Sequence, residues 1–106
     1  MNEELRKRID EMVKGHRVVL FMKGSPFMPM CGFSASIVDT LKAAGATDVA
    51  AYDVLKDPEI RQGIKEYANW PTIPQLYVDG KFIGGCDIVR EMHERGELAP
   101  LVAPAK

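Results

Sequence analysis

The chain has only two cysteines and two histidines among its 106 residues. Two cysteines are too few for the disulfide framework of a small secreted domain, so a reducing compartment is the better default. The histidines, His16 and His93, share no metal-ligand spacing with each other or with the cysteines, which argues against a zinc site. We therefore expect a fold held together by its own core, with both cysteines left as candidates for chemistry.

An excess of charge of one sign and long apolar runs are also missing. Fourteen basic residues face fifteen acidic ones, giving a net charge of −1 without any basic block, so neither nucleic acid nor a membrane is an expected partner. The first twelve residues are charged from the start, unlike a signal peptide, and no apolar run is long enough to cross a bilayer. We expect a soluble, cytoplasmic protein, or one of the mitochondrial matrix or plastid stroma if a targeting segment was removed.

Several common functional motifs are absent as well. Nothing in the sequence resembles a Walker loop, a dinucleotide-binding fingerprint or the nucleophile elbow of a hydrolase. With 106 residues, 46% of them hydrophobic, the chain is long enough to bury a core without metal or disulfide support. We expect a single domain over residues 1–106.

Apolar periodicity and breaker residues predict the elements in the order helix, strand, helix, strand, helix, strand, strand, helix. These elements fall near residues 2–14, 18–22, 33–43, 49–54, 57–67, 75–78, 81–83 and 88–102. Asp57 and Pro58 are typical of a helix start, Asp79 and Gly80 of a tight hairpin, and Gly96 interrupts the last helix. The tail, residues 103–106, is expected to fray.

This order predicts an α/β fold with one four-stranded mixed sheet and helices on both faces. Strand, helix and strand in succession form a right-handed parallel crossover, and the hairpin adds two antiparallel strands. The continuous apolar run at 18–22 is typical of a strand buried on both faces. Ligands of such folds bind beyond the carboxyl ends of the parallel strands, which is where the loop after residue 22 begins.

That loop carries Cys31. Pro26 and Pro29 fix backbone angles and remove two N–H donors, so a stiff surface loop should hold the cysteine. The predicted helix begins at or just after Cys31, so its free N–H groups, together with the charge of Lys23, should lower the pKa of the thiol. The alternative is a small buried hydrophobic residue, as many lone cysteines are. The polar, proline-bounded loop favours the reactive thiolate.

The third residue after Cys31 is Ser34, so the chain has no C-x-x-C pair. A single sulfur must act alone or with a partner from elsewhere. A disulfide between Cys31 and Cys86 would require their Cα atoms to approach within ~7 Å, which the sequence does not establish. For Cys86, a packing role is as good an interpretation as a redox or ligand role.

Four motifs, in this order along nearly the whole chain, resemble the monothiol glutaredoxins of CGFS type. They are KGSP at 23–26, CGFS at 31–34, WPTIPQLYV at 70–78 and GGCD at 84–87. The resemblance implies a thioredoxin-like fold with a cis peptide bond before Pro74. It also implies a glutathione groove and a 2Fe-2S cluster bridged between two subunits.

The same resemblance implies which residues hold glutathione. Lys23 and Arg61 correspond to the partners of its glycine carboxylate, and Lys65, one turn further along the same helix, is a weaker candidate. Thr72 and Ile73 correspond to the extended segment that pairs with the backbone of the tripeptide. These positions supply the cations and the backbone surface that a peptide with two carboxylates needs.

The γ-glutamyl end of glutathione is implied to lie at Gly85, Cys86 and Asp87. Helix N–H groups would receive its carboxylate, and Asp87 its ammonium group. An ordinary N-cap is the alternative for Asp87, and both roles can coexist. Trp70 and Phe33 are candidates for the pocket walls, although core packing is the better account of Trp70.

An iron–sulfur cluster of this kind takes four thiolates. One Cys31 and one glutathione thiol per subunit supply two, so a homodimer supplies four, and the ligands that are not protein make the cluster easy to release. The resemblance thus implies a cluster carrier or scaffold that serves acceptor proteins and pairs with BolA-family proteins. The alternatives are a monothiol glutathione-disulfide oxidoreductase, with weak activity at most, and a redox-sensing interaction module that uses Cys31.

Overall fold

The computed structural model describes residues 1–104 and contains the predicted elements in the predicted order. They are α1 (Glu3–Lys14), β1 (Val18–Met22), α2 (Gly32–Ala43), β2 (Val49–Asp53), a short 3-10 turn η1 (Val54–Lys56), α3 (Pro58–Ala68), β3 (Gln75–Val78), β4 (Lys81–Gly84), α4 (Cys86–Glu94) and α5 (Ala99–Val102). The interruption expected at Gly96 separates α4 from α5. Residues 105–106 of the tail that was expected to fray lie outside the described residues.

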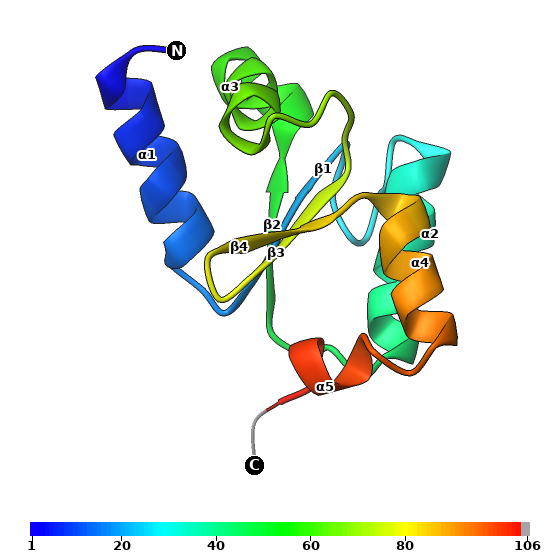
Figure 1. The fold of residues 1–106 in the computed structure, drawn as a ribbon. Coiled ribbons are helices and arrows are strands. Elements are labelled where there is room, and N and C mark those ends of the chain that lie inside the picture. The colour runs from blue at the N-terminus through cyan, green and yellow to red at the C-terminus, as the bar shows by residue number, and fades with distance from the viewer. Residues whose placement is uncertain (105–106) are drawn as a thin grey trace.

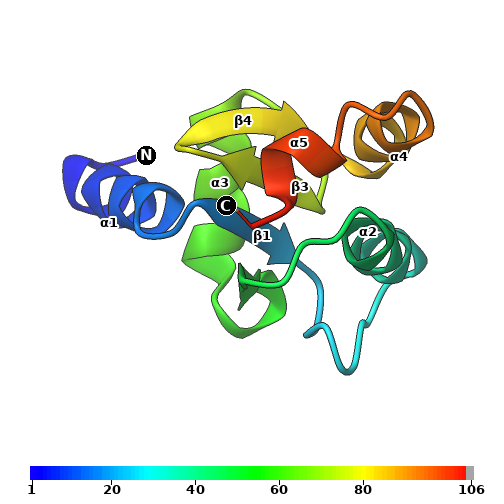
Figure 2. The same cartoon turned by 90° about the horizontal axis from the view of Figure 1, so that it is seen from below.

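The four strands form one mixed sheet in the order β2-β1-β3-β4 (Figures 1 and 2). β1 runs parallel to β2, β3 runs antiparallel to β1, and β4 runs antiparallel to β3. The predicted crossover and hairpin are therefore confirmed. β1 is an interior strand with a neighbour on each side, so the loop that follows it starts from a strand that is hydrogen-bonded along both edges.

Helices cover both faces of this sheet, with α1 and α3 on one side and α2 and α4 on the other (Figure 2). Alternate residues of β1 point to opposite layers, and all five are buried, as the continuous apolar run predicted. The first layer contains Val18, Leu20, Met22, Ile37, Leu41, Val89 and Leu98. The second layer contains Ile9, Val13, Val19, Phe21, Ile60 and Ile64.

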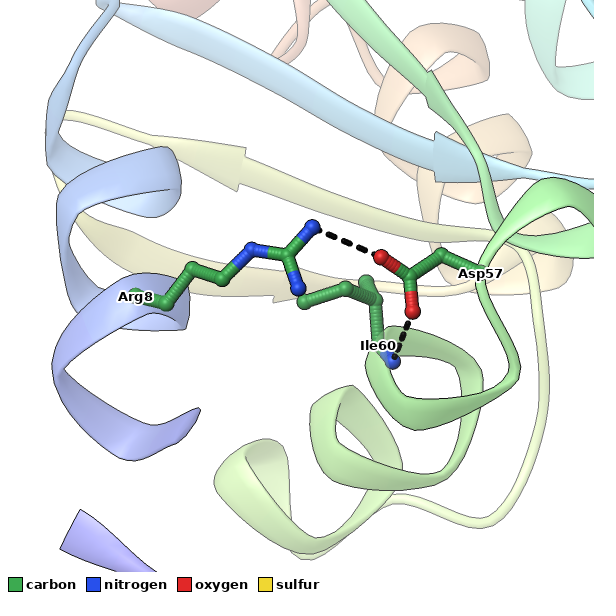
Figure 3. A network of polar contacts seen from close by, with 3 residues as sticks. All are labelled: Arg8, Asp57 and Ile60. Carbon is green, nitrogen blue, oxygen red and sulfur yellow. Dashed lines mark hydrogen bonds and ion pairs between the residues drawn. The ribbon is translucent and has the colours of Figure 1, made fainter. Parts of the chain in front are cut away.

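The carboxylate of Asp57 caps the N-terminus of α3 and also binds a side chain of α1 (Figure 3). Asp57 is the predicted N-cap, and its Oδ1 accepts the N–H of Ile60 at 3.2 Å. Its Oδ2 accepts a hydrogen bond from Arg8 on α1 at 2.6 Å. The Arg8 hydrogen bond and then the Ile60 N–H hold the pKa of Asp57 below its usual value of 3.8.

Among residues 1–104, no helix has both the length and the apolar character required to cross a membrane. The longest helices, α1 and α2, have 12 residues each, well short of the roughly 20 that a span needs.

Candidate glutathione and cluster site

The cysteine loop, residues 23–31, is a small closed hairpin rather than an open excursion. Ser25 and Met28 exchange backbone hydrogen bonds of 3.1 Å in both directions. Gly24, with a φ of 87°, forms an isolated antiparallel bridge with Pro29. This positive φ favours glycine because other residues carry a Cβ that clashes there. The stiff loop expected from the prolines is therefore confirmed.

Three hydrogen bonds fix the base of this loop, two of them to residues outside it. The Gly24 N–H donates to Asp53 Oδ1 at 2.9 Å, at the end of β2. The Met30 N–H donates to the Lys23 carbonyl at 2.9 Å. The Lys23 N–H donates to the hydroxyl of Ser34 at 3.0 Å, and Ser34 is fully buried. Sequence reasoning treated Ser34 only as a missing thiol and missed the anchoring role of Asp53.

Cys31 is the N-cap residue of α2 and is partly exposed, as its predicted place at the helix start requires. The pKa of its thiol lies below the ordinary 9.0, chiefly because of the nearby Ser34 backbone N–H, with smaller contributions from the Phe33 N–H, the Lys23 charge and the Ser34 hydroxyl. Partial burial opposes this shift. The lowered pKa was predicted, but Lys23 is a minor cause of it.

A pocket of about 600 Å³ opens beside Cys31. Its walls come from the cysteine loop, the start of α2, α3, the segment 70–74 and the start of α4. The lining residues are Lys23, Cys31, Phe33, Lys65, Trp70, Pro71, Thr72, Ile73, Pro74, Gly85, Cys86, Asp87 and Ile88. Lysines at one part of the wall and an aspartate at another suit a ligand that carries both carboxylates and an ammonium group.

The pocket brings together all but one of the residues named from the sequence. Those that line it are Lys23, Cys31, Thr72, Ile73, Gly85, Cys86 and Asp87. Arg61 is not among the lining residues, whereas Lys65, the weaker candidate, is. Lys65 lies one turn nearer the end of α3 that leads into the segment 70–74. A role for Arg61 in ligand binding stays a prediction.

A buried glutamine holds the segment 70–74 in place. Gln75 Nε2 donates to the carbonyls of Trp70 and Thr72 at 3.2 Å each, and Gln75 Oε1 accepts the Tyr77 hydroxyl proton at 3.0 Å. The peptide bond between Ile73 and Pro74 is cis, as the family resemblance implied. Sequence reasoning missed Gln75, although an uncharged polar residue at the start of an otherwise apolar strand is a usable signal.

The start of α4 forms another part of the pocket wall. Gly85 is the N-cap and Cys86, which is buried, is the first helical residue. The N-cap interpretation of Asp87 is therefore wrong, because Asp87 lies within the first helical turn and pairs with Arg90 at 3.1 Å. Its carboxylate is exposed at the pocket, so a role toward an ammonium group remains open to it. Both cysteines are free thiols.

Trp70 packs closely against this helix start. A Cβ added to Gly85 would lie 3.3 Å from the Pro74 carbonyl oxygen and 3.4 Å from Trp70 Nε1. The indole also packs on Phe82, with ring centroids 5.5 Å apart. Within residues 1–104, Trp70 Nε1 is the buried side-chain nitrogen without a hydrogen-bond partner. Trp70 is half-buried and belongs to neither core layer, so its place is the pocket wall, where it packs on Phe82, rather than the core that was expected.

The described residues contain no group of three or more histidine, cysteine, aspartate or glutamate side chains that could hold a metal ion. Cys31 is the accessible thiol of the site, since Cys86 is buried. One chain therefore offers a single exposed sulfur beside a peptide-sized pocket. Any cargo that needs four thiolates would have to obtain the others from outside this chain.

Comparison with known proteins agrees with this geometry. The glutaredoxin family model matches residues 18–83. A zebrafish protein named glutaredoxin-related protein 5, mitochondrial, is 53% identical over 93 residues, covering 88% of this chain and 60% of its own length. A Synechocystis protein named uncharacterized monothiol glutaredoxin ycf64-like is 51% identical, covering 99% of this chain and 97% of its own. Monothiol glutaredoxin-5, mitochondrial, of Saccharomyces cerevisiae is 50% identical, with coverages of 100% and 72%.

Solved structures show the same fold. The solution structure of reduced poplar apo GrxS14 is 47% identical, with a TM-score of 0.77, and the match covers 91% of this chain and 87% of the other. The crystal structure of a buckwheat glutaredoxin–glutathione complex is 25% identical, with a TM-score of 0.80 and coverages of 96% and 94%. These matches confirm the thioredoxin-like fold that the motifs implied.

Proposed function

The chain belongs to the glutaredoxin family, and from its solitary reactive thiol we propose that it is a glutathione-dependent carrier of 2Fe-2S clusters. The observation that carries this proposal is the pairing of one exposed sulfur, on Cys31, with a pocket of about 600 Å³ at its side. A dithiol mechanism within the CGFS motif is ruled out, because the position three residues on is Ser34. The missing thiol would be that of glutathione bound in the pocket.

The proposed orientation of glutathione follows the charges on the pocket wall. Lys23 and Lys65 would receive the glycine carboxylate, with Arg61 as a further candidate from the same helix. Thr72 and Ile73 would pair with the peptide backbone. The glutathione complex of the buckwheat relative supports glutathione as the ligand.

The γ-glutamyl group would lie at the start of α4. The free N–H groups of Cys86 and its neighbours would bind its carboxylate, and Asp87 would bind its ammonium group. In this orientation the glutathione thiol lies beside the Cys31 sulfur.

In this proposal the protein carries the cluster as cargo, and the number of thiolates that the cluster needs determines how many subunits bind it. A homodimer in which each subunit contributes Cys31 and one glutathione supplies the four thiolates. The N–H groups of Ser34 and Phe33 lower the pKa of the Cys31 thiol, which favours the thiolate form that a metal ligand needs. Two of the four ligands are not protein, so thiolates of an acceptor protein can replace them. Pairing with a BolA-family protein is part of the same proposal.

Reconstitution tests the proposal directly. Anaerobic incubation with iron, sulfide and glutathione should give visible charge-transfer absorption, with two irons per dimer. Cys31→Ser should abolish this absorption, while the matched control Cys86→Ser should keep it. Absence of absorption in the wild-type protein, or its persistence in Cys31→Ser, would refute the carrier function.

A second candidate is a monothiol oxidoreductase, which the lowered pKa of Cys31 favours. The Cys31 thiolate would attack a glutathione mixed disulfide, release the substrate thiol and form a Cys31–glutathione disulfide. A second glutathione thiolate would then release oxidised glutathione and restore Cys31. Rapid turnover of a small glutathionylated substrate by protein that assembles no cluster would establish this function instead.

A redox-sensing module is the third candidate, because Cys31 and Cys86 are both free and line one pocket. Mass spectrometry of the oxidised protein should then find a Cys31–Cys86 bridge or a Cys31–glutathione adduct. If neither forms, this candidate has no basis.

For the compartment, we propose the cytoplasm, with the mitochondrial matrix or plastid stroma as the alternative. The zebrafish and yeast relatives carry the word mitochondrial in their names, which supports the alternative. Fractionation of the source cells, with an antibody against the chain, would decide between them.

A further inference from the structure

Large apolar side chains are exposed on both sides of Cys31 in the sequence. Phe27 is 97% exposed, Met28 71%, Met30 65% and Phe33 63%. We call these four residues the apolar rim. Of the seven large hydrophobic side chains that are exposed among the described residues, four belong to it. A stretch of seven residues, 27–33, thus holds most of the exposed large apolar side chains.

The rim is held rigidly rather than left to collapse onto the core. Pro26 occupies the second position of a turn closed by the Ser25 and Met28 hydrogen bonds, so the chain at Phe27 is fixed with its ring in solvent. The base of the loop is anchored to Asp53. A surface ordered in advance loses less conformational entropy when it binds.

The stretch of chain that carries the rim has few charges of its own, and the nearby charges of Lys23, Lys65 and Asp87 line the adjoining pocket. From Gly24 through Val38 there is no Asp, Glu, Lys, Arg or His, and the Cys31 thiol is the one group that can become charged near neutral pH, although 27% of the whole chain is charged. An acidic or basic partner would find no complementary groups in this stretch. The rim therefore fits a partner whose own face is apolar and weakly charged.

The apolar area of the rim is smaller than a stable dimer interface needs and suits a transient complex. Four side chains exposed to this degree present on the order of 500 Å² of apolar surface, the size of functional patches on monomers. A stable interface buries about 800 Å² on each partner, and smaller ones belong to transient encounters. The unbranched thioethers of Met28 and Met30 adapt to partners of different shape. These properties favour several short-lived partners over one permanent copy of the same chain.

We propose that the apolar rim is the docking surface for acceptor proteins, which bind it transiently through an apolar, weakly charged face. Met30 and Phe33 flank Cys31 in the chain, so a protein seated on the rim has its own thiols beside the sulfur that holds the cargo. This inference rests on the proposed carrier function and names the partner that the site would serve.

The test uses the double variant Phe27→Asn, Met28→Gln, because neither residue lines the pocket and asparagine suits a turn. The matched control is Leu101→Gln, an exposed apolar residue of α5. α5 lies near the start of β1, where Arg17 binds the Leu101 carbonyl, whereas the cysteine loop follows the end of β1 (Figure 1). Cluster transfer from each reconstituted protein to the apo form of a plant-type 2Fe-2S ferredoxin is followed against ferredoxin concentration.

In the double variant, the half-saturating ferredoxin concentration should rise about five- to tenfold. Loss of the cluster to a small chelator should be unchanged, and the control should match the wild type in both assays. The half-saturating concentration should also change little between low and moderate salt. Equal values in the double variant and wild type, or a steep salt dependence, would overturn the proposal.

Two other outcomes would have different meanings: self-association of the protein through the rim, and failure of the protein to assemble a cluster. If sedimentation shows that the apo protein dimerises and the double variant does not, the rim is an interface between copies, and the proposal is overturned. If the wild type assembles no cluster, the carrier function fails by itself. The rim is then tested by deglutathionylation of a glutathionylated protein and of a small glutathionylated peptide. The half-saturating concentration should be higher in the double variant than in the wild type for the protein substrate only. Equal effects on both substrates would overturn the docking role.

Discussion

The backbone N–H of Lys23 donates to the hydroxyl of Ser34 across 3.0 Å, joining the end of β1 to the first turn of α2. Ser34 is fully buried, and its own N–H is the strongest single stabiliser of the Cys31 thiolate. The fourth residue of the CGFS motif therefore does more than lack a sulfur: it holds the chain on both sides of the reactive cysteine.

Replacing Ser34 with alanine should leave the Lys23 N–H without its acceptor in a partly buried place. We expect a loss of about 1–3 kcal/mol in the free energy of unfolding, measured by urea denaturation. The pKa of Cys31, read from thiolate ultraviolet absorbance, should rise because the hydroxyl contribution is lost. Unchanged stability and pKa in Ser34→Ala would show that the hydroxyl is not needed.

Gly24→Ala should disrupt the cysteine loop. Gly24 has a φ of 87°, and an added Cβ would lie against the Met28 carbonyl oxygen and 2.6 Å from the Met30 nitrogen. Because both obstacles are backbone atoms, relief requires the loop to move, and we expect a loss of about 1–3 kcal/mol. Gly32→Ala is the control, since an added Cβ there meets nothing within 4 Å. Similar unfolding midpoints for both variants would contradict this assignment.

The pH dependence of Cys31 follows from its lowered pKa. Ionisation is favoured in the folded state, so the thiolate adds stability that is fully present above the ordinary pKa of 9.0 and is lost as pH falls through the folded value. The stability difference between wild type and Cys31→Ala should accordingly grow as pH rises through the folded pKa. A flat difference across that range would contradict the shift.

Alkylation rates report the same ionisation more directly. Iodoacetamide should modify Cys31 before the buried Cys86, with a pH midpoint below 9.0. Lys23→Gln should move this midpoint upward only slightly, because the Ser34 N–H outweighs the Lys23 charge. A return of the midpoint to 9.0 in Lys23→Gln would show that the lysine charge dominates.

Asp57 makes the two contacts shown in Figure 3, a helix cap and an ion pair, and substitutions can test their contributions to stability separately. Asp57→Ala removes the Ile60 cap and the Arg8 contact together and should cost about 1–2 kcal/mol. Asp57→Asn keeps an oxygen for the cap, and Arg8→Gln removes only a surface pair, so each should cost under about 1 kcal/mol. Stability from the Asp57 carboxylate should be lost as pH falls through its folded pKa, below 3.8. Equal losses in all three variants would contradict this division.

Lys65→Gln should weaken glutathione binding more than Arg61→Gln, because only Lys65 lines the pocket. We expect the dissociation constant to rise about threefold to tenfold in Lys65→Gln, the range of a partly solvated charge contact. Trp70, the single tryptophan, lines the pocket and gives a fluorescence signal for the titration. The reverse order of the two variants would assign the glycine carboxylate to Arg61.

Local patterns were enough to predict most of the fold. The apolar run of β1, the hairpin at Asp79 and Gly80, and the cap at Asp57 each depend on neighbours within a few residues. The placement of Cys31 at the start of α2 followed from the same kind of evidence. Periodicity and breaker residues carry that information in any single sequence.

The contacts that were missed join distant parts of the chain. Asp53 and Gly24 are 29 residues apart, and no local pattern pairs them. The choice between Arg61 and Lys65 depends on where the end of α3 lies against another segment, which periodicity leaves open. The surface loop before Cys31 was predicted, but the degree of exposure of Phe27, 97%, could not be read from the sequence.

The pocket walls come from segments spread between Lys23 and Ile88, on both sides of the central strand. No contiguous fragment of the chain can therefore bind the ligand, and the native sheet must be complete before a site exists. By mass action, a ligand at a hundred times its dissociation constant then protects the whole fold by about 2.7 kcal/mol. Under the proposed function, depletion of glutathione would therefore lower the stability of this protein as well as its occupancy by the cluster.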